Sequence, residues 1–184
     1  MGNGTIRDLP DEARARFQVL RQSADAGVAA ALEDLARTGS DRANNRINAL
    51  EFATSRNLNQ DRVLSAFVHA SRLGLFDMSW NLLCPGCGGV LDANATLKSL
   101  DKNDYPCAIC ASDYSPTLDE MVEVSFTVNP RVRRIQAHDP DRLPMMEYLR
   151  QMFWSSGMDV AEEDFEPVLQ KVMMESVELA AGEK

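Results

Sequence analysis

Apolar residues recur at helical spacing through the first part of the chain. The spacing predicts one or two short helices over residues 11–37, with a break near Ala26-Gly27. The positions that carry this pattern are Phe17, Leu20, Val28, Leu32 and Leu35.

A further helix is predicted after the polar turn ARTGSDRANN. Ser40 or Asp41 can cap its first turn, because both side chains accept hydrogen bonds from free backbone N–H groups. Ile47, Leu50 and Ala53 would then lie on one apolar face of that helix.

The next helix has clear start and stop signals. Asn59 is a good N-cap, and Gly74 suits the left-handed position just after a helix, with Leu75 folding back on the last turn. The two helices, joined by a short turn with Leu58 inward, have the shape of a helix-turn-helix. The predicted buried positions of the second helix are Val63, Phe67 and Ala70.

Beyond residue 75 the apolar pattern changes from helical to extended. FDMSWNLLC is short and partly alternating, and it predicts a strand that leads into a cysteine pair. VEVSFTVN, residues 122–129, alternates strictly and predicts a half-buried strand. A helical pattern resumes over residues 145–178, with a helix end expected at Trp154.

All four cysteines lie in the stretch CPGCGGVLDANATLKSLDKNDYPCAIC, as two CxxC pairs. Cys84 and Cys87 form the first pair and Cys107 and Cys110 the second, with nineteen residues between the pairs. A C-x2-C-x15–20-C-x2-C pattern is typical of zinc sites. Four thiolates complete a tetrahedron, so we expect one structural Zn2+ per chain with no position left for a catalytic water.

Other uses of the four thiols are weighed against zinc. Two disulfides would need an oxidising compartment, and a thioredoxin-like role usually needs one CxxC at the start of a helix. Four thiolates also suit iron, so a rubredoxin-like or iron–sulfur site stays open. The histidines, His69 and His138, would replace a cysteine only if the two pairs failed to converge.

The charge balance narrows the choice of partners. The chain carries 28 acidic and 19 basic residues, a net charge of −9, which argues against non-specific affinity for nucleic acid or anionic lipid. The first residues hold no apolar signal region, and no apolar run approaches the ~20 residues that span a bilayer. We therefore expect a cytoplasmic location and no membrane partner.

The helix-turn-helix pattern raises the question of DNA binding, with residues 60–73 as the recognition helix. A helix that enters a DNA groove normally presents more Lys, Arg and Asn on one face than this one does. Residues 41–83 are also close to neutral, so we favour helical packing or contact with a protein. The polar side chains of the candidate helix are Gln60, Asp61, Arg62, His69 and Arg72.

Three arginines, Arg131, Arg133 and Arg134, follow the second predicted strand. They could recognise a phosphate or an acidic partner. We favour a solvated strand end whose positive charge offsets the net negative charge of the zinc thiolates.

Two stretches, ALEFATSRNLNQDRVLSAFVHASRLGLFDMSWNLLCPGCGG and YPCAICASDYSPTLDEMVEVSFTVNPRVR, carry a resemblance to a known family. Over about residues 40–138 the chain resembles the uncharacterised N-terminal region that precedes the catalytic domain in a group of bacterial class III adenylate/guanylate cyclases. The second CxxC, Tyr114 after it and the following strand match in order. The resemblance implies a zinc-binding regulatory or interaction module. It places no catalytic residue in this chain.

Together these observations predict an α+β chain in three parts. They are a helical, helix-turn-helix-like unit over residues 1–75, a zinc ribbon with short antiparallel strands over 76–138, and C-terminal helices over 139–184. We expect a non-enzymatic regulatory or protein-interaction module that contacts a protein partner or adjoining domain. The alternative is a nucleic-acid-binding or transcription-associated zinc ribbon, and an enzyme that uses the thiols is least favoured. Homo-oligomerisation stays open.

Overall fold

A computed structural model of the chain carries the description that follows. The structure describes residues 7–94, 96–99, 104–107, 109–115, 117 and 121–154. The helices predicted between residue 155 and residue 178 lie outside the described residues.

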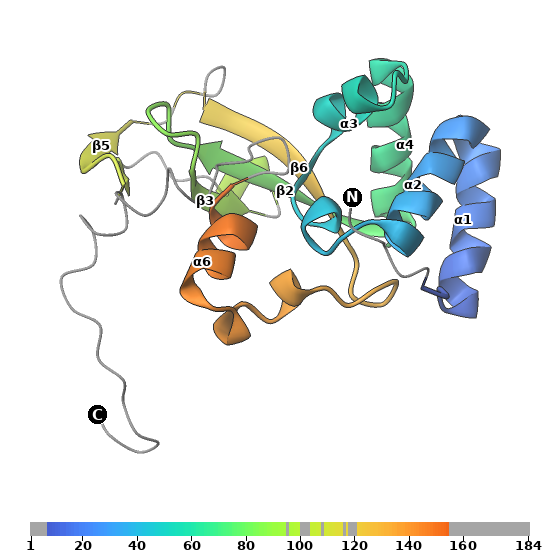
Figure 1. The fold of residues 1–184 in the computed structure, drawn as a ribbon. Helices are drawn as coiled ribbons and strands as arrows, with labels where there is room; N and C mark the ends of the chain where they lie inside the picture. Colours follow the sequence, from blue (N-terminus) through green and yellow to red (C-terminus); the bar gives the residue numbers. More distant parts are fainter. Residues whose placement is uncertain are drawn as a thin grey trace.

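Four helices gather at one end of the molecule (Figure 1). The break predicted near residue 26 is confirmed, because the Asp25 carboxylate caps the second helix and accepts N–H bonds from Gly27 and Val28 at 3.0 Å. The helices are α1 (Asp11–Ser23), α2 (Ala26–Thr38), α3 (Ala49–Ser55) and α4 (Gln60–Arg72).

Both predicted ends of α4 are confirmed. The Asn59 side chain accepts the Arg62 N–H at 3.0 Å, and Gly74 has a φ of 67°. The Leu75 N–H donates to the Ala70 carbonyl at 2.9 Å, which closes the last turn. These local hydrogen bonds fix the point at which the chain leaves α4 and enters the sheet.

The start predicted for the preceding helix is wrong. Asn48, not Ser40 or Asp41, caps α3, by accepting N–H bonds from the residues at 50 and 51. Ile47 pairs with Phe126 as part of a two-residue strand, so the chain is extended just before the helix. Leu50 was expected on the buried face, but its side chain is 46% exposed.

The strands form two antiparallel sheets. The larger has the order β1-β6-β2-β3, and the smaller is the hairpin β4-β5. Both strands predicted from the sequence, β2 and β6, are confirmed and pair along their length. The strands are β1 (Ile47–Asn48), β2 (Phe76–Leu83), β3 (Val90–Asn94), β4 (Tyr105–Cys107), β5 (Ser112–Tyr114) and β6 (Val122–Val128).

Short helical turns complete the described elements. The beginning of the predicted C-terminal helical segment is an α-turn followed by a π-turn, and Trp154 lies just past its end. These elements are η1 (Arg42–Asn44), η2 (Leu97–Ser99), η3 (Gln136–His138), η4 (Pro140–Arg142), α6 (Met145–Tyr148) and the π-turn η5 (Leu149–Phe153).

One apolar core joins the helices to the larger sheet. The Phe67 ring of α4 is edge-on to Phe52 and Phe76, with centroids 5.5 Å away in each case. It stacks on Phe126 of β6 at 4.6 Å. The predicted α+β class is therefore confirmed. The three-part division stays a prediction, and this core crosses its first boundary at residue 75.

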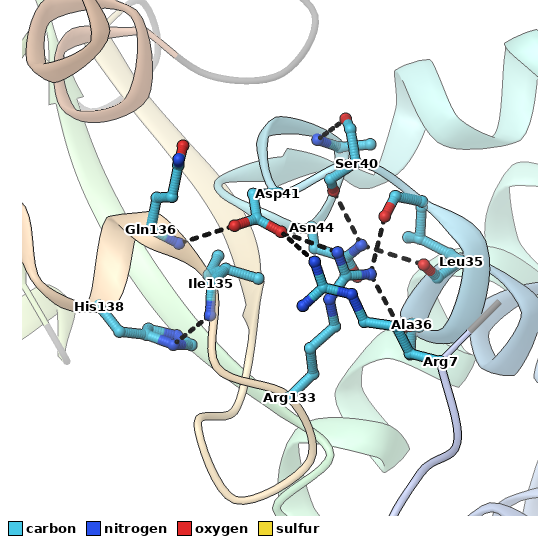
Figure 2. A network of polar contacts seen from close by, with 12 residues as sticks. Arg7, Leu35, Ala36, Ser40, Asp41, Asn44, Arg133, Ile135, Gln136 and His138 are labelled. Atoms are coloured by element: carbon cyan, nitrogen blue, oxygen red, sulfur yellow. Dashed lines mark hydrogen bonds and ion pairs between the residues drawn. The ribbon is translucent and has the colours of Figure 1, made fainter. Parts of the chain in front are cut away.

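The favoured interpretation of Arg133 as part of a solvated strand end is wrong. Its side chain is 8% exposed and donates to the carbonyls of Ala36 and Gly39 at 3.0 and 2.7 Å, at the end of α2. It also pairs with Asp41 at 2.8 Å, and Asp41 accepts the Gln136 N–H (Figure 2). A cation there satisfies helix-end carbonyls and fastens the segment after β6 to the helices. Arg131 and Arg134 are exposed, as expected.

No helix in the described part of the chain is both long enough and apolar enough to cross a membrane.

Candidate metal centre

The first cysteine pair lies in the turn between β2 and β3. β2 ends one residue before Cys84, and β3 begins at Val90. Two backbone hydrogen bonds close this turn: the Cys84 N–H donates to the Gly89 carbonyl at 2.7 Å, and the Gly88 N–H donates to the Cys84 carbonyl at 2.8 Å. The chain therefore doubles back and presents both sulfurs on the same side.

The second pair lies in the β4-β5 hairpin. Cys107 is the last residue of β4 and pairs with Ser112 of β5. Cys110 lies in the turn between them, and its N–H approaches the Cys107 sulfur at 3.5 Å. Backbone N–H groups directed at sulfur favour the thiolate form, which is the form that binds metals.

The structure brings all four predicted sulfurs together. The distance is 3.7 Å from Cys84 Sγ to Cys110 Sγ and also from Cys87 Sγ to Cys107 Sγ, and all four atoms lie within 4.8 Å of one another. A tetrahedron with zinc–sulfur bonds of about 2.3 Å has edges of about 3.8 Å. The sulfurs are too far apart for disulfides, which need about 2.05 Å, and all four cysteines are free.

Each turn contributes one deeper and one shallower sulfur. Cys84 and Cys107 are buried, while Cys87 and Cys110 are partly exposed. The two short sulfur–sulfur distances join different turns, so each pairs a buried cysteine with a half-buried one. The cluster thus links two segments that are distant in the sequence and leaves one side of the group near solvent.

The pKa shifts of the cysteine thiols indicate that the four sulfurs need a bound cation to ionise together. Burial raises the pKa of the Cys84 thiol, but the N–H groups of Cys87 and Gly86 donate to its sulfur, and the resulting pKa falls to about 7. Burial raises the pKa of both the Cys87 and the Cys110 thiols. Four thiolates this close repel one another, so a bound cation is what would allow all of them to ionise together.

Gly86 leaves room that no other residue could leave. A Cβ atom at this position would lie 2.8 Å from the Tyr114 hydroxyl and 2.9 Å from Cys110 Sγ. Tyr114 comes from β5 and covers the thiols from that side. Burial, followed by its hydrogen bond with Cys110, raises the pKa of Tyr114 to about 12, so its hydroxyl stays protonated.

The two cysteine turns share a backbone conformation. Gly88 follows the second cysteine of the first turn with a φ of 68°, and Ala111 follows that of the second turn with a φ of 50°. Glycine adopts this left-handed conformation without cost, whereas alanine is strained there. The same turn is therefore built twice, once with a suitable residue and once with a strained one.

Two residues that contact the centre were not predicted from the sequence. The Trp154 indole N–H donates to the Cys87 carbonyl at 3.3 Å, and a Cβ on Gly89 would overlap the Phe153 ring. Phe153 is the last residue of η5, and Trp154 follows it. The glycine at position 89 was the one local sign that something packs closely against this turn.

Neither histidine belongs to the centre. His69 is partly buried on α4, and His138 hydrogen-bonds the Ile135 N–H at 3.2 Å and the Val128 carbonyl at 2.9 Å. Within the described ranges, the four cysteines are the group of potential ligands that lies close enough to hold a metal ion.

Comparison with protein families gives one match. The model of DUF5939, a family of unknown function, matches residues 10–184. The chain belongs to this family. The DUF5939 match includes all four cysteines together with Phe153 and Trp154. Comparisons with the curated proteins and with the solved structures found no match.

Proposed function

We propose that this DUF5939 chain is a non-catalytic regulatory or protein-interaction module built around one structural zinc ion. The observation that carries the proposal is the spacing of the sulfurs, 3.7 Å across each pair from the two turns. Zinc binds four thiolates in a tetrahedron without redox chemistry. We therefore favour zinc over iron as the bound metal in a reducing cytoplasm. The two turns and their strands then form a zinc ribbon.

The need for a metal follows from the size of the hairpin. β4 and β5 have three residues each, and an isolated two-stranded hairpin is marginally stable at best in water. Structural zinc binds such thiolate sites with a free energy on the order of 10 kcal/mol. One ion held between Cys84 and Cys110, and between Cys87 and Cys107, would therefore attach the hairpin to the larger sheet.

The absence of catalysis is proposed from the ligand set. Catalytic zinc keeps one position for water or substrate, whereas four cysteines fill the tetrahedron. Thiols that are bound to zinc are also withheld from redox or nucleophilic chemistry. The protein would then contribute shape and contact surface, and no reaction of its own.

The exposed side of α4 supports protein contact over DNA contact. α3, the turn and α4 form the helix-turn-helix-like unit, and α4 would be its recognition helix. The solvent-facing side chains Leu64 and Val68 are 37% and 40% exposed. Arg62 pairs with Asp25 at 2.9 Å, which uses one of the few basic groups of this helix. A DNA-reading helix presents unpaired basic and amide groups instead.

We further propose, from the family resemblance, that the adjoining domain is the catalytic domain of a nucleotide cyclase. The module would then act as a regulatory or docking element next to that domain. The resemblance supports this proposal through the two CxxC pairs, Tyr114 and the strand that follows them.

Elemental analysis tests the metal proposal. Protein purified without chelator is expected to hold one zinc per chain, and a Cys107→Ser variant is expected to hold far less. Ser112→Ala, directly opposite Cys107 in the hairpin, is the matched control and should retain the ion. Less than one metal per wild-type chain, or iron in place of zinc, would contradict the proposal.

A gel shift tests the choice of partner. At about 100 mM salt, DNA affinity that weakens steeply as salt is raised would favour the nucleic-acid alternative. We expect no salt-sensitive binding of DNA, because the chain is acidic and the outer side of α4 is partly apolar.

A further inference from the structure

A cavity lies beside the metal centre, and none of the four cysteines lines it. Its volume is about 260 Å³, and it opens where the loop before β1, the strand β3 and the segment α6–η5 meet. Figure 1 shows α6 lying close to β3 at this place. Its lining residues are Arg46, Val90, Leu91, Asp92, Ala93, Tyr148, Met152 and Phe153.

The cationic side chain of this cavity, Arg46, has one nitrogen without a hydrogen-bond partner among the described residues. Arg46 Nη1 is buried and hydrogen-bonds to none of the described residues. Burial, and then the nearby charge of Arg42, lower the pKa of Arg46 to about 10, so the group stays charged at neutral pH. The carboxylate of Glu123 acts in the opposite direction, but it accepts a hydrogen bond from Asn48 at 2.7 Å. A buried donor nitrogen without a hydrogen bond is costly, so an acceptor is expected to satisfy it.

Local structure does not explain an arginine at position 46. Its φ is 46°, in the left-handed region where glycine or asparagine costs less. Its backbone N–H donates to Thr127 Oγ1 at 3.0 Å, a bond that any residue except proline could make. Neither backbone conformation nor pairing selects this side chain. A residue that breaks local preference without structural gain is typical of a functional site.

The η5 segment that lines part of the cavity also has an unusual conformation. Met152 and Phe153 belong to the π-turn η5. Such turns are rare overall, but they occur disproportionately often at functional sites. Most of the remaining lining is apolar. The one carboxylate, that of Asp92, already accepts hydrogen bonds from Asn94 at 2.7 Å and from the Tyr105 hydroxyl at 3.4 Å.

From this arrangement we infer that the cavity binds a small organic anion. A carboxylate or phosphate would accept hydrogen bonds from the Arg46 guanidinium, and an aromatic or aliphatic body would lie against Val90, Met152 and Phe153. One cation beside apolar walls suits a ligand with an anionic group and an apolar body. The anion would pair with the guanidinium, and the body would cover the apolar side chains. This binding site goes beyond the proposed zinc module and does not depend on the metal assignment.

Fluorine NMR on the full 184-residue chain, purified with its metal site loaded, tests the inference. The probes are 4-fluorobenzoate and its neutral counterpart 4-fluorobenzamide. We expect the benzoate to bind and the benzamide to bind at least about tenfold more weakly, since the charge-assisted bond to Arg46 is lost. Phenyl phosphate should displace the benzoate if phosphates are accepted, and failure to displace it would assign the site to carboxylates.

Two variants separate this site from general binding to arginine. Arg46→Met should weaken benzoate binding by about tenfold or more, whereas Arg56→Met, in the cavity between η1 and α3, should leave it unchanged. Equal binding of the two probes, undiminished binding by Arg46→Met, or no benzoate binding would each overturn the inference. The melting temperature of Arg46→Met should not fall, because the change removes a buried donor nitrogen that makes no hydrogen bond within the described part of the chain. If that variant fails to fold, the two probes on the wild-type chain still decide.

Discussion

The helical end of the molecule and the β4-β5 hairpin are held by different interactions. Among the helices, Phe17, Leu20 and Phe67 are completely buried and belong to one apolar cluster. In the hairpin, Cys107 is the one buried residue of those described. The first region can be stable through burial of apolar surface, whereas the second has almost none to bury and would depend on the proposed metal.

The two regions differ in how far the apolar core reaches them. The apolar cluster reaches β6, which also pairs with β2, so the larger sheet gains from the helices. The hairpin lies beyond that cluster and contacts β3 at the other end of the molecule (Figure 1). A metal would hold the part of the fold that the core does not reach.

Removal of the metal is expected to have the largest effect, and to be confined to one region. With a strong zinc chelator, the amides of Tyr105, Cys107 and residues 112–114 should exchange with deuterium as in an unfolded chain, because a contribution on the order of 10 kcal/mol is lost. The amides of α4 should stay protected. Hydrogen exchange with mass spectrometry measures both regions at once. Equal loss of amide protection in the hairpin and in α4 would contradict the proposal that they are held by different interactions.

Truncation in the apolar core should have the opposite distribution. Phe67→Ala removes a ring that contacts three others, and it should lower the free energy of unfolding by about 3–5 kcal/mol in urea titrations. Its neighbour on α4, the half-exposed Val68, provides the control, and Val68→Ala should cost less than about 1 kcal/mol. Folded Phe67→Ala should still hold one metal, and loss of the ion would show that the two regions are not independent.

Within the metal centre, the two turns carry different residues at the left-handed position after their second cysteine, and exchanging these residues should have opposite effects. Gly88→Ala places a strained residue at a φ of 68° and should lower stability by about 1 kcal/mol. Ala111→Gly relieves the same strain and should raise it by roughly 0.5–1 kcal/mol, with part of the gain offset by a more flexible unfolded chain. Thermal unfolding of the metal-loaded proteins measures both. Changes of the same sign would contradict the equivalence of the two turns.

The smallest expected effect is a pH dependence that arises from His138 in η3, the short turn after β6. Burial lowers the pKa of His138, outweighing its bond to the Val128 carbonyl and the charge of Asp77, while Arg134 also favours the neutral ring. The unfolded chain, with a histidine pKa of about 6.5, therefore binds more protons than the fold just below that pH. The free energy of unfolding should be at its full value above about pH 6.5 and decrease as the pH falls below it.

Urea titrations at several pH values between about 5 and 7.5 check this dependence. Protonation also removes the lone pair with which His138 Nδ1 accepts the Ile135 N–H. A His138→Gln variant should lack this part of the slope. An unchanged slope in that variant would assign the dependence to other groups.

The sequence predicted those features whose cause is local. The caps at Asn59 and Gly74 act within one turn of α4, so both ends of that helix were predicted correctly. The strict alternation before Asn129 predicted β6 for the same reason. The four cysteines are far apart in the chain, but the CxxC spacing imposes the local turn that lets two sulfurs face one point.

Features that depend on distant partners were missed. α3 starts late because Ile47 pairs with Phe126, and no local signal marks that pairing. Arg133 looked solvated because its partner Asp41 lies in another part of the chain. The contacts of Phe153 and Trp154 with the first cysteine turn have the same origin, since only the folded chain brings them there.

The hydrogen bonds of Trp154 tie the segment after η5 to two distant parts of the chain. Its indole N–H donates to the Cys87 carbonyl at 3.3 Å, and its own carbonyl accepts from Arg42 at 2.7 Å. The segment α6–η5 is thus fastened at its end to the first cysteine turn. If the cysteines hold zinc as proposed, a shortage of zinc would loosen this attachment before the helices themselves were disturbed.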